Sequence, residues 1–390
     1  MFFAKNRNLK KYVDGIYPIT NACKNDENIN KVNGTIGSLY NEENTIVAYK
    51  TVYQTLRNLS NENIASYASG SFGNKDYNDA ISNYVLEDRI NNYRTIPTPG
   101  GTGAINMAIN MCLEKGDSII LPEVAWGNYK NIALEYDLNV LTYDIYDLDS
   151  LLILLDKLDK IFIVINSPCQ NPCGLSYTFE QWKRIVDYLN NCNKEAIILN
   201  DVAYMDYSYN QNYKDYFELF NHLNNNVLIL IAYSCSKAFS FYGVRLGSLF
   251  VIHNDEIFLD DFINQCARRA RATYSNVNNG AMKTIVELLN NHYEEYISEK
   301  DYYISLLKKR SNIFINECKD NGLDIYPYNE GFFVTLKFDD SNIRDEAFEK
   351  LLKEHLYFIK MNKGIRVGIC AIPIKDIYGL AKKIKSIISG

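Results

Sequence analysis

Five short runs of mostly consecutive apolar residues recur along the middle of this 390-residue chain. They span Ser118–Pro122, Ile161–Asn166, Ala196–Asn200, Val227–Tyr233 and Ser248–Ile252. Runs without polar alternation are typical of strands buried on both faces, as in a parallel sheet covered by helices. Amphipathic stretches lie between them, and one, from Thr178 to Asn190, opens with residues that favour a helix start. The pattern therefore predicts an α/β fold.

The pattern changes in the last third of the chain. A stretch from Asn279 to Glu317 carries Leu, Ile and Tyr at helical spacing and is broken at Gly322. Strand-like runs follow at 331–338 and 364–369, and a helix-like stretch at 375–388 closes the chain. We therefore predict a large α/β domain over residues 46–285 and a smaller α+β domain that combines residues 1–45 with residues 286–390.

Composition and charge narrow the class of protein. Hydrophobic residues make up 47% and charged residues 23%, which is ordinary for a globular chain. With 41 basic and 47 acidic residues the net charge is −6, which argues against a partner that is a nucleic acid or a membrane surface. No apolar run approaches the ~20 residues that span a bilayer. The first twelve residues lack the apolar core of a signal peptide.

The counts of cysteine and histidine bear on compartment and chemistry. Nine scattered cysteines, an odd number, fit free thiols in a reducing compartment, so we expect a cytoplasmic protein. Only four histidines are present and none is spaced as a metal-binding pair. Metal-dependent hydrolysis and histidine-based triads are therefore not expected, and we predict no metal site.

Chemically distinctive side chains follow the predicted strands, where ligands bind in doubly wound sheets. In chain order they are Trp126, Asn171, Asp201, Tyr204, Ser234, Lys237 and Arg245, and a glycine-rich turn at 99–104 precedes them. The turn and Arg245 suit a phosphate. Asp201 suits a protonated ring nitrogen, Trp126 a ring face and Lys237 an aldehyde. Together they predict pyridoxal 5′-phosphate as the cofactor.

Three motifs resemble those of the fold-type I pyridoxal-phosphate enzymes, specifically class I aminotransferases of the aspartate and aromatic aminotransferase group. The motifs are Ser234-x-Ser-Lys237 with Arg245-x-Gly247 downstream, Asn171-Pro-x-Gly174, and Asp201-x-x-Tyr204. The resemblance extends over about residues 32–371. It implies a mostly parallel seven-stranded sheet covered by helices, a homodimer with shared active sites, and transamination between amino acids and 2-oxo acids.

The resemblance also implies a role for each matching residue. Those that bind the cofactor are Lys237, Gly101, Thr102, Trp126, Asn171, Asp201, Tyr204, Ser234, Arg245 and, from the neighbouring subunit, Tyr67. Lys237, Asp201 and Tyr204 are the catalytic residues among them. Lys237 attaches the cofactor and acts as the general base, Asp201 pairs with the ring nitrogen, and Tyr204 bonds the ring oxygen.

Five residues are implied to bind substrate. Arg366, in Gly364-Ile-Arg-Val-Gly, resembles the arginine that binds the α-carboxylate, and Gly37 resembles part of the N-terminal segment that closes over it. Arg271 resembles the arginine through which a partner subunit binds the side-chain carboxylate of aspartate or glutamate. Trp126 and Asn171 contact substrate as well as cofactor. The expected donors are therefore aspartate, glutamate or aromatic amino acids, with 2-oxoglutarate or oxaloacetate as acceptor.

Some positions leave alternatives open. Tyr129 stands where relatives commonly have His, so the support of Asp201 is unsettled, and Arg268 or Arg269 could replace Arg271 in its role. A carbon–sulfur β-lyase would share the cofactor residues and differ only in the reaction. A non-enzymatic cofactor-sensing domain, as in some transcription regulators, would need an attached basic helix-turn-helix segment and is opposed by the negative charge.

Overall fold

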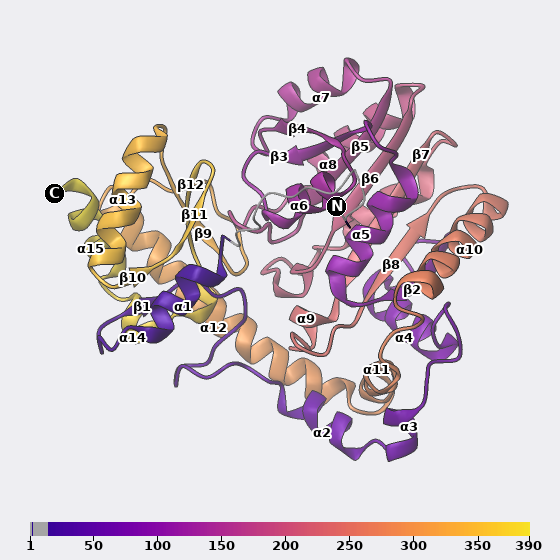
Figure 1. The fold of residues 1–390 in the computed structure, drawn as a ribbon, viewed down its shortest axis with the longest axis horizontal. Coiled ribbons are helices and arrows are strands. Elements are labelled where there is room, and N and C mark those ends of the chain that lie inside the picture. Colours follow the sequence, from indigo (N-terminus) through magenta and orange to yellow (C-terminus); the bar gives the residue numbers. More distant parts are fainter. Residues whose placement is uncertain (1, 3–14) are drawn as a thin grey trace.

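The computed structural model describes residue 2 and residues 15–390. The first twelve residues, for which we expect no signal peptide, therefore lie largely outside the described residues. The same holds for the start of the predicted small domain. A seven-stranded sheet forms the centre of one part of the molecule (Figure 1). Its strands are β2 (Tyr93–Thr98), β3 (Ser118–Pro122), β4 (Asn139–Tyr143), β5 (Lys160–Asn166), β6 (Glu195–Asp201), β7 (Val227–Ser234) and β8 (Gly247–Ile252).

The sheet has the order β2-β8-β7-β6-β5-β3-β4. β8 runs antiparallel to both β2 and β7, and the other neighbouring strands pair in parallel. Every residue of β7 is buried, as expected for a central strand covered on both faces. The predicted α/β fold with a mostly parallel seven-stranded sheet is thus confirmed.

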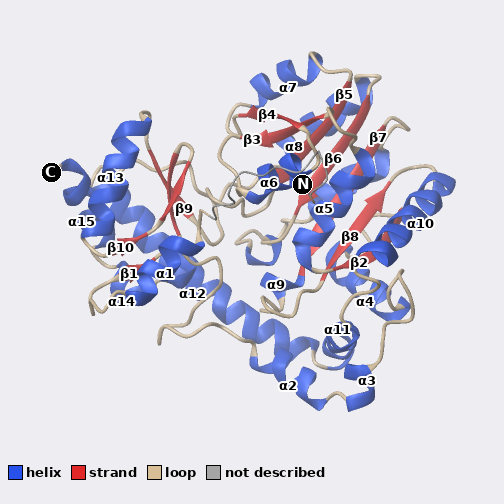
Figure 2. Ribbon diagram, in the orientation of Figure 1, coloured by secondary structure: helices blue, strands red, loops and turns tan. Residues whose placement is uncertain are grey.

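Helices cover both faces of this sheet (Figure 2). α5 (Gly100–Cys112), α6 (Asn128–Glu135) and α10 (Glu256–Thr273) pack on one face. α4 (Lys75–Leu86), α7 (Leu148–Asp156), α8 (Phe179–Asn191) and α11 (Asn279–Asn291) pack on the other. α8 starts where the sequence predicts, because Thr178 and Gln181 form a reciprocal capping box. Short helices complete this part: α2 (Lys50–Asn58), α3 (Asn61–Ala65), α9 (Cys235–Ala238), η1 (Met205–Tyr207) and η2 (Asp215–His222).

A smaller group of elements lies to one side (Figure 1). β9 (Val334–Lys337), β11 (Ile359–Met361) and β12 (Gly364–Val367) form an antiparallel sheet, and β1 (Val32–Asn33) pairs in parallel with β10 (Leu356–Tyr357). Around them lie α1 (Tyr17–Asn25), α13 (Ser341–Lys353), η3 (Ile369–Ala371), α14 (Ile374–Ile377) and α15 (Leu380–Ser389). The β1–β10 pairing brings the N-terminal segment beside the last third of the chain. The domain boundaries at residues 45 and 285 stay a prediction.

Two predicted helices differ from the structure. The stretch 279–317 forms two helices, α11 and α12 (Tyr293–Asp320), which are separated at His292, where φ is −136°. Apolar spacing continues across this break, so the pattern does not reveal it. The closing stretch is split into α14 and α15 at Gly379, whose φ of 77° only glycine adopts readily. Within residues 15–390, no helix is both long and apolar enough to cross a membrane.

Candidate active site

The side chains predicted to follow β5, β6 and β7 meet at one edge of the sheet. Asn166, at the end of β5, pairs with Asp201 at the end of β6, and its side chain donates to the Asp201 carbonyl at 2.8 Å. The same Asn166 side chain accepts from the Asn171 backbone N–H at 2.8 Å. β7 ends beside β6 and leads directly into α9, which carries Lys237. Parallel strands thus place three predicted site residues at neighbouring positions.

The Lys237 amine lies in a pocket of aromatic rings. Its Nζ donates to the Gly37 carbonyl, and it lies 5.2 Å from the ring centre of Tyr204 and 4.9 Å from that of Tyr242. Burial lowers the pKa of Lys237 to about 8, and the positive charge of Arg366 acts in the same direction. At pH 7 about one-tenth of an amine with this pKa is neutral, far more than for an ordinary lysine with a pKa of ~10.4, and a nucleophile or base must be neutral.

Asp201 is a buried carboxylate held by two donors. The Tyr129 hydroxyl donates to Oδ2, and the Ala203 N–H donates to Oδ1 at 3.0 Å. Burial raises the pKa of Asp201, and these two bonds oppose that rise. Tyr129 thus supports the Asp201 carboxylate, although relatives commonly have His at this position. The half-buried Trp126 packs edge-on against the Tyr129 ring, with ring centres 5.3 Å apart.

Arg366 is a buried cation with no carboxylate beside it among the described residues. The side chain is 3% exposed, and its Nη1 donates to Asn171 Oδ1 at 3.2 Å and its Nη2 to the Thr35 carbonyl at 2.8 Å. Its Nε is buried without a hydrogen-bond partner, and its guanidinium lies 4.3 Å from the Phe333 ring centre. Because an uncompensated buried charge is costly, this arrangement favours binding of an anion such as a substrate carboxylate.

A set of small and cationic residues surrounds the start of α5. A Cβ at Gly100 would lie 2.5 Å from Arg245 Nη2, and one at Gly101 would lie 2.9 Å from Ser234 Cβ. Arg245 Nη1 donates to Ser236 Oγ at 3.1 Å. The close approach requires glycine, and it leaves backbone N–H groups, hydroxyls and a guanidinium at a helix N-terminus. This donor set fits a phosphate group.

Beside this N-terminus lies a cavity of about 390 Å³. Its lining includes Thr102, Arg245, Arg269 and Tyr274. The two arginines give the cavity a positive charge that is continuous with the donor set at the start of α5, because Arg245 belongs to both.

Two predicted residues lie away from the cluster around Lys237. Tyr67 is 85% exposed. Arg271 is exposed at the end of α10, where its Nη1 donates to Ser275 Oγ at 2.5 Å. The single chain therefore does not bring these two side chains to its own site. That placement is compatible with service to a neighbouring subunit, which the resemblance implies.

Several contacting residues were not among the sequence-predicted ones. Tyr242 lies over Lys237, and its hydroxyl accepts from the Leu39 N–H at 3.0 Å. The sequence signal that could have identified Tyr242 is its position five residues after Lys237. Thr35 acts through its backbone carbonyl, which no sequence pattern marks. Among the residues described, no group of three or more His, Cys, Asp or Glu could hold a metal ion.

These groups fit pyridoxal 5′-phosphate in their chemistry. A donor-rich helix start matches its phosphate, a buried carboxylate matches its ring nitrogen, and a lysine amine of lowered pKa matches its aldehyde. Tyr204 and Asn171 are hydrogen-bonded to each other beside the amine, where a ring hydroxyl could bind. The fold and the site define a pyridoxal-phosphate enzyme of fold type I.

Comparison with known proteins places the chain more narrowly. The family model "Aminotransferase class I and II" matches residues 30–384, and the chain belongs to this family. Aspartate aminotransferase of Haemophilus influenzae is 22% identical over 96% of this chain and 98% of its own length. The crystal structure of an aminotransferase from Anaerococcus prevotii has a TM-score of 0.94 and 27% identity, with 100% of both chains covered.

A third comparison concerns a protein with its cofactor in place. An aromatic-amino-acid aminotransferase from Burkholderia pseudomallei, covalently bound to pyridoxal phosphate, has a TM-score of 0.80 and 20% identity over 99% of this chain and 100% of that one. This similarity supports the fold. Membership of the family confirms the predicted transaminase class and, with it, pyridoxal 5′-phosphate as the cofactor.

Proposed function

We propose that this chain transfers the amino group of aspartate, glutamate or an aromatic L-amino acid to 2-oxoglutarate or oxaloacetate. The observation that carries the proposal is the buried, carboxylate-free Arg366, which is joined through Asn171 to the same edge as Lys237. An arginine in that position can hold an α-carboxylate while a neutral lysine amine reaches the adjacent α-carbon. The two half-reactions use the same groups in turn, which gives ping-pong kinetics.

Each step depends on a residue of the chain. Arg366 binds and orients the α-carboxylate, and Asn171 keeps the guanidinium in place. Lys237, freed from the cofactor, takes the α-proton as general base and returns it in the reverse half-reaction. Gly37, whose carbonyl accepts from the lysine amine, belongs to the segment that covers the site and excludes water.

The cofactor, when bound, supplies an aldehyde that takes the amino group and a ring that accepts electrons. Asp201 would hold its ring nitrogen in the protonated state, and Tyr204 its ring oxygen. Gly101, Thr102, Ser234 and Arg245 would bind its phosphate, and Trp126 would stack on its ring. The chemistry of each of these side chains supports the role that we propose for it.

We also propose a cytoplasmic homodimer in which each subunit completes the other's site. The partner's Tyr67 would enter the 390 Å³ cavity beside Thr102 and Arg245 and bond the phosphate. The partner's Arg271 would bind the distal carboxylate of aspartate or glutamate, since a guanidinium pairs with a carboxylate in bidentate fashion. Exposure of both side chains in the single chain supports the proposal.

Replacement of Lys237 tests the proposal most directly. We expect Lys237→Ala to abolish steady-state transamination and the visible absorbance band of the bound cofactor. Lys214→Met, which removes another buried lysine, serves as the control and should retain both. Retained turnover in Lys237→Ala would refute the assignment.

The donor class is decided by a half-reaction screen on the wild-type protein. Each amino acid is mixed with the loaded enzyme, and the loss of the visible band is followed. Aspartate, glutamate or an aromatic amino acid should discharge the band fastest. Release of pyruvate and thiol from cystathionine, without oxo-acid-dependent transamination, would instead identify a carbon–sulfur lyase.

A further inference from the structure

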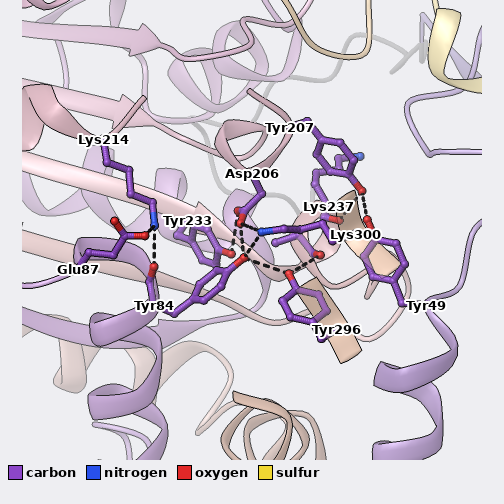
Figure 3. Close-up of polar contacts among 11 residues, drawn as sticks. Tyr49, Tyr84, Glu87, Asp206, Tyr207, Lys214, Tyr233, Lys237, Tyr296 and Lys300 are labelled. Carbon is purple, nitrogen blue, oxygen red and sulfur yellow. Dashed lines mark hydrogen bonds and ion pairs between the residues drawn. The ribbon is translucent and has the colours of Figure 1, made fainter. Parts of the chain in front are cut away.

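A buried ion pair, Asp206 with Lys300, lies near Lys237 and is surrounded by tyrosines (Figure 3). Asp206 Oδ1 and Lys300 Nζ are 3.3 Å apart, and both side chains are almost fully buried. The Tyr84 hydroxyl donates to Asp206 Oδ1, and the Tyr233 hydroxyl donates to Oδ2 at 3.1 Å. Lys300 also donates to the Tyr84 hydroxyl at 2.9 Å. We call Tyr84, Asp206, Tyr233, Tyr296 and Lys300 the tyrosine network.

The tyrosine network reaches the backbone of the segment that follows β7, residues 235–246, which we call the lysine loop. The Tyr296 hydroxyl lies 3.1 Å from that of Tyr84 and donates to the carbonyl of Ala238 at 2.9 Å. Next to it, the Tyr207 hydroxyl donates to the carbonyl of Lys237 at 3.2 Å. The reacting lysine and the residue after it are therefore both held through their backbone carbonyls. Figure 3 shows Tyr207 and Tyr296 on either side of Lys237 and Lys300.

α12 carries two members of the network and also contacts the substrate-binding side. Tyr296 and Lys300 lie in its first turns, whereas Arg310 lies about 15 Å beyond Lys300 along the helix axis. Arg310 donates to the Cys370 carbonyl at 2.8 Å and the Tyr40 carbonyl at 2.9 Å. Cys370 is four residues beyond Arg366. One rigid helix thus joins the lysine loop to the segment that follows the substrate arginine (Figure 1).

Stability alone does not account for a buried ion pair at this place. Desolvation of two charges costs several kcal/mol, and well-packed apolar residues of similar volume are often at least as stabilising. Hydrogen bonds are directional, however, and a fully connected polar network specifies one geometry of the groups that it joins. The Asp206 carboxylate accepts from three groups, so the network is well satisfied.

We propose that Asp206 and Lys300 are positioning residues of the transamination reaction. Through Tyr296 they hold the lysine loop, and through α12 they keep the Lys237 amine at a fixed distance from Arg366. The inference rests on the proposed function, because that function makes this distance matter. Neither residue touches substrate or cofactor, so their effect is on the turnover step, which depends on the placement of the amine.

The test compares Tyr296→Phe and Lys300→Met with the wild-type holoenzyme. Tyr296→Phe removes only the hydroxyl that bonds Ala238, so it is the milder variant. Both should exchange the amide hydrogens of residues 235–246 faster, and both should lower kcat about 10- to 100-fold. The KM for the amino acid should stay within about 3-fold, because Arg366 is untouched.

Lys214→Met is the matched control, since Lys214 is 4% exposed and Lys300 is 7% exposed. Its Nζ bonds the backbone carbonyl of Tyr84 at 2.8 Å and the Glu87 carboxylate at 2.6 Å. Lys300 instead bonds the Tyr84 hydroxyl and the Asp206 carboxylate, which connect to the lysine loop through Tyr296. Lys214→Met should lower Tm without altering loop exchange or kcat.

The positioning role is overturned if Tyr296→Phe and Lys300→Met lower Tm but match the wild type in loop exchange and kcat. It is also overturned if only KM changes. If Lys300→Met does not fold, Tyr296→Phe decides alone. An inactive wild-type protein would be a failure of the proposed function instead, and loop exchange would still show whether the network holds the loop.

Discussion

At the scale of single residues, the surroundings of the Lys237 amine determine when it can react. The amine lies between two tyrosine rings, and burial together with the positive charge of Arg366 favours its neutral form. A pKa of about 8 means that the amine gains a proton as the pH falls below 8 and loses it as the pH rises above 8. Only the neutral amine can attack an aldehyde.

Covalent capture of the cofactor should therefore depend on pH in a defined way. When cofactor-free protein is mixed with pyridoxal 5′-phosphate, we expect the rate of covalent attachment to rise with pH up to about 8 and to level off above it. An ordinary lysine, with a pKa of ~10.4, would level off only above pH ~10. Stopped-flow absorbance measures the rate, with Lys237→Ala as the blank. A rate that still rises about tenfold per pH unit between pH 9 and 10 would contradict the lowered pKa.

Site residues with distinctive chemistry could be predicted from the sequence, because their order and spacing along the chain match a set of family motifs. Lys237, Asp201 and Arg366 belong to this group. Asp206 and Lys300 could not be found, because they lie 94 positions apart and such residues are usually exposed. Tyr129 was noticed as a departure, but only the structure shows its hydroxyl on Asp201.

At the scale of elements, apolar runs predicted the central strands well. The five predicted strands match β3, β5, β6, β7 and β8 to within one residue at each end. The edge strands β2 and β4 were not predicted, because they contain fewer apolar residues and are only partly buried. The direction of β8 was not predictable either, since a strand buried on both faces has the same composition in both directions.

The loop after β5 depends on Gly174, the last residue of the Asn171-Pro-x-Gly motif. Its φ is 70°, and a Cβ there would lie 2.6 Å from the Glu330 carbonyl and 2.3 Å from the Tyr328 ring. We expect Gly174→Ala to lower the free energy of unfolding by about 3 kcal/mol, through backbone strain and overpacking together.

Chemical denaturation measures this loss. The matched control is Gly127→Ala, at a glycine whose φ is negative and where an added Cβ meets nothing within 4 Å. The control should change stability by less than about 1 kcal/mol. Equal stability of the two variants would show that the motif glycine is not required for packing.

At the scale of the whole molecule, the proposed shared-site dimer would explain why two family-matched residues lie apart from the site. Arg366 is buried and Lys237 is half-buried, whereas Tyr67 and Arg271 are exposed. In a two-fold symmetric dimer, exposed residues of one subunit can complete the site of the other. Each subunit would then supply the amine of one site and the distal arginine of the other.

Subunit mixing tests this arrangement. Lys237→Ala and Arg271→Ala homodimers should each be nearly inactive with aspartate. After unfolding and refolding together, about half of the dimers are mixed, and each of these has one intact site, so about a quarter of wild-type activity should return. Activity no higher than that of the unmixed variants, or an active monomer on gel filtration, would rule out shared sites.

The antiparallel direction of β8 has a consequence for chain length. Because β8 runs back along β7, the lysine loop begins and ends at the same edge of the sheet, and both Lys237 and Arg245 stay there. The seven residues between them set how far the amine lies from the Arg245 guanidinium, which we propose binds the phosphate. Single substitutions in this segment leave that length unchanged. One inserted residue would add up to about 3.5 Å of chain and disturb amine and phosphate binding together.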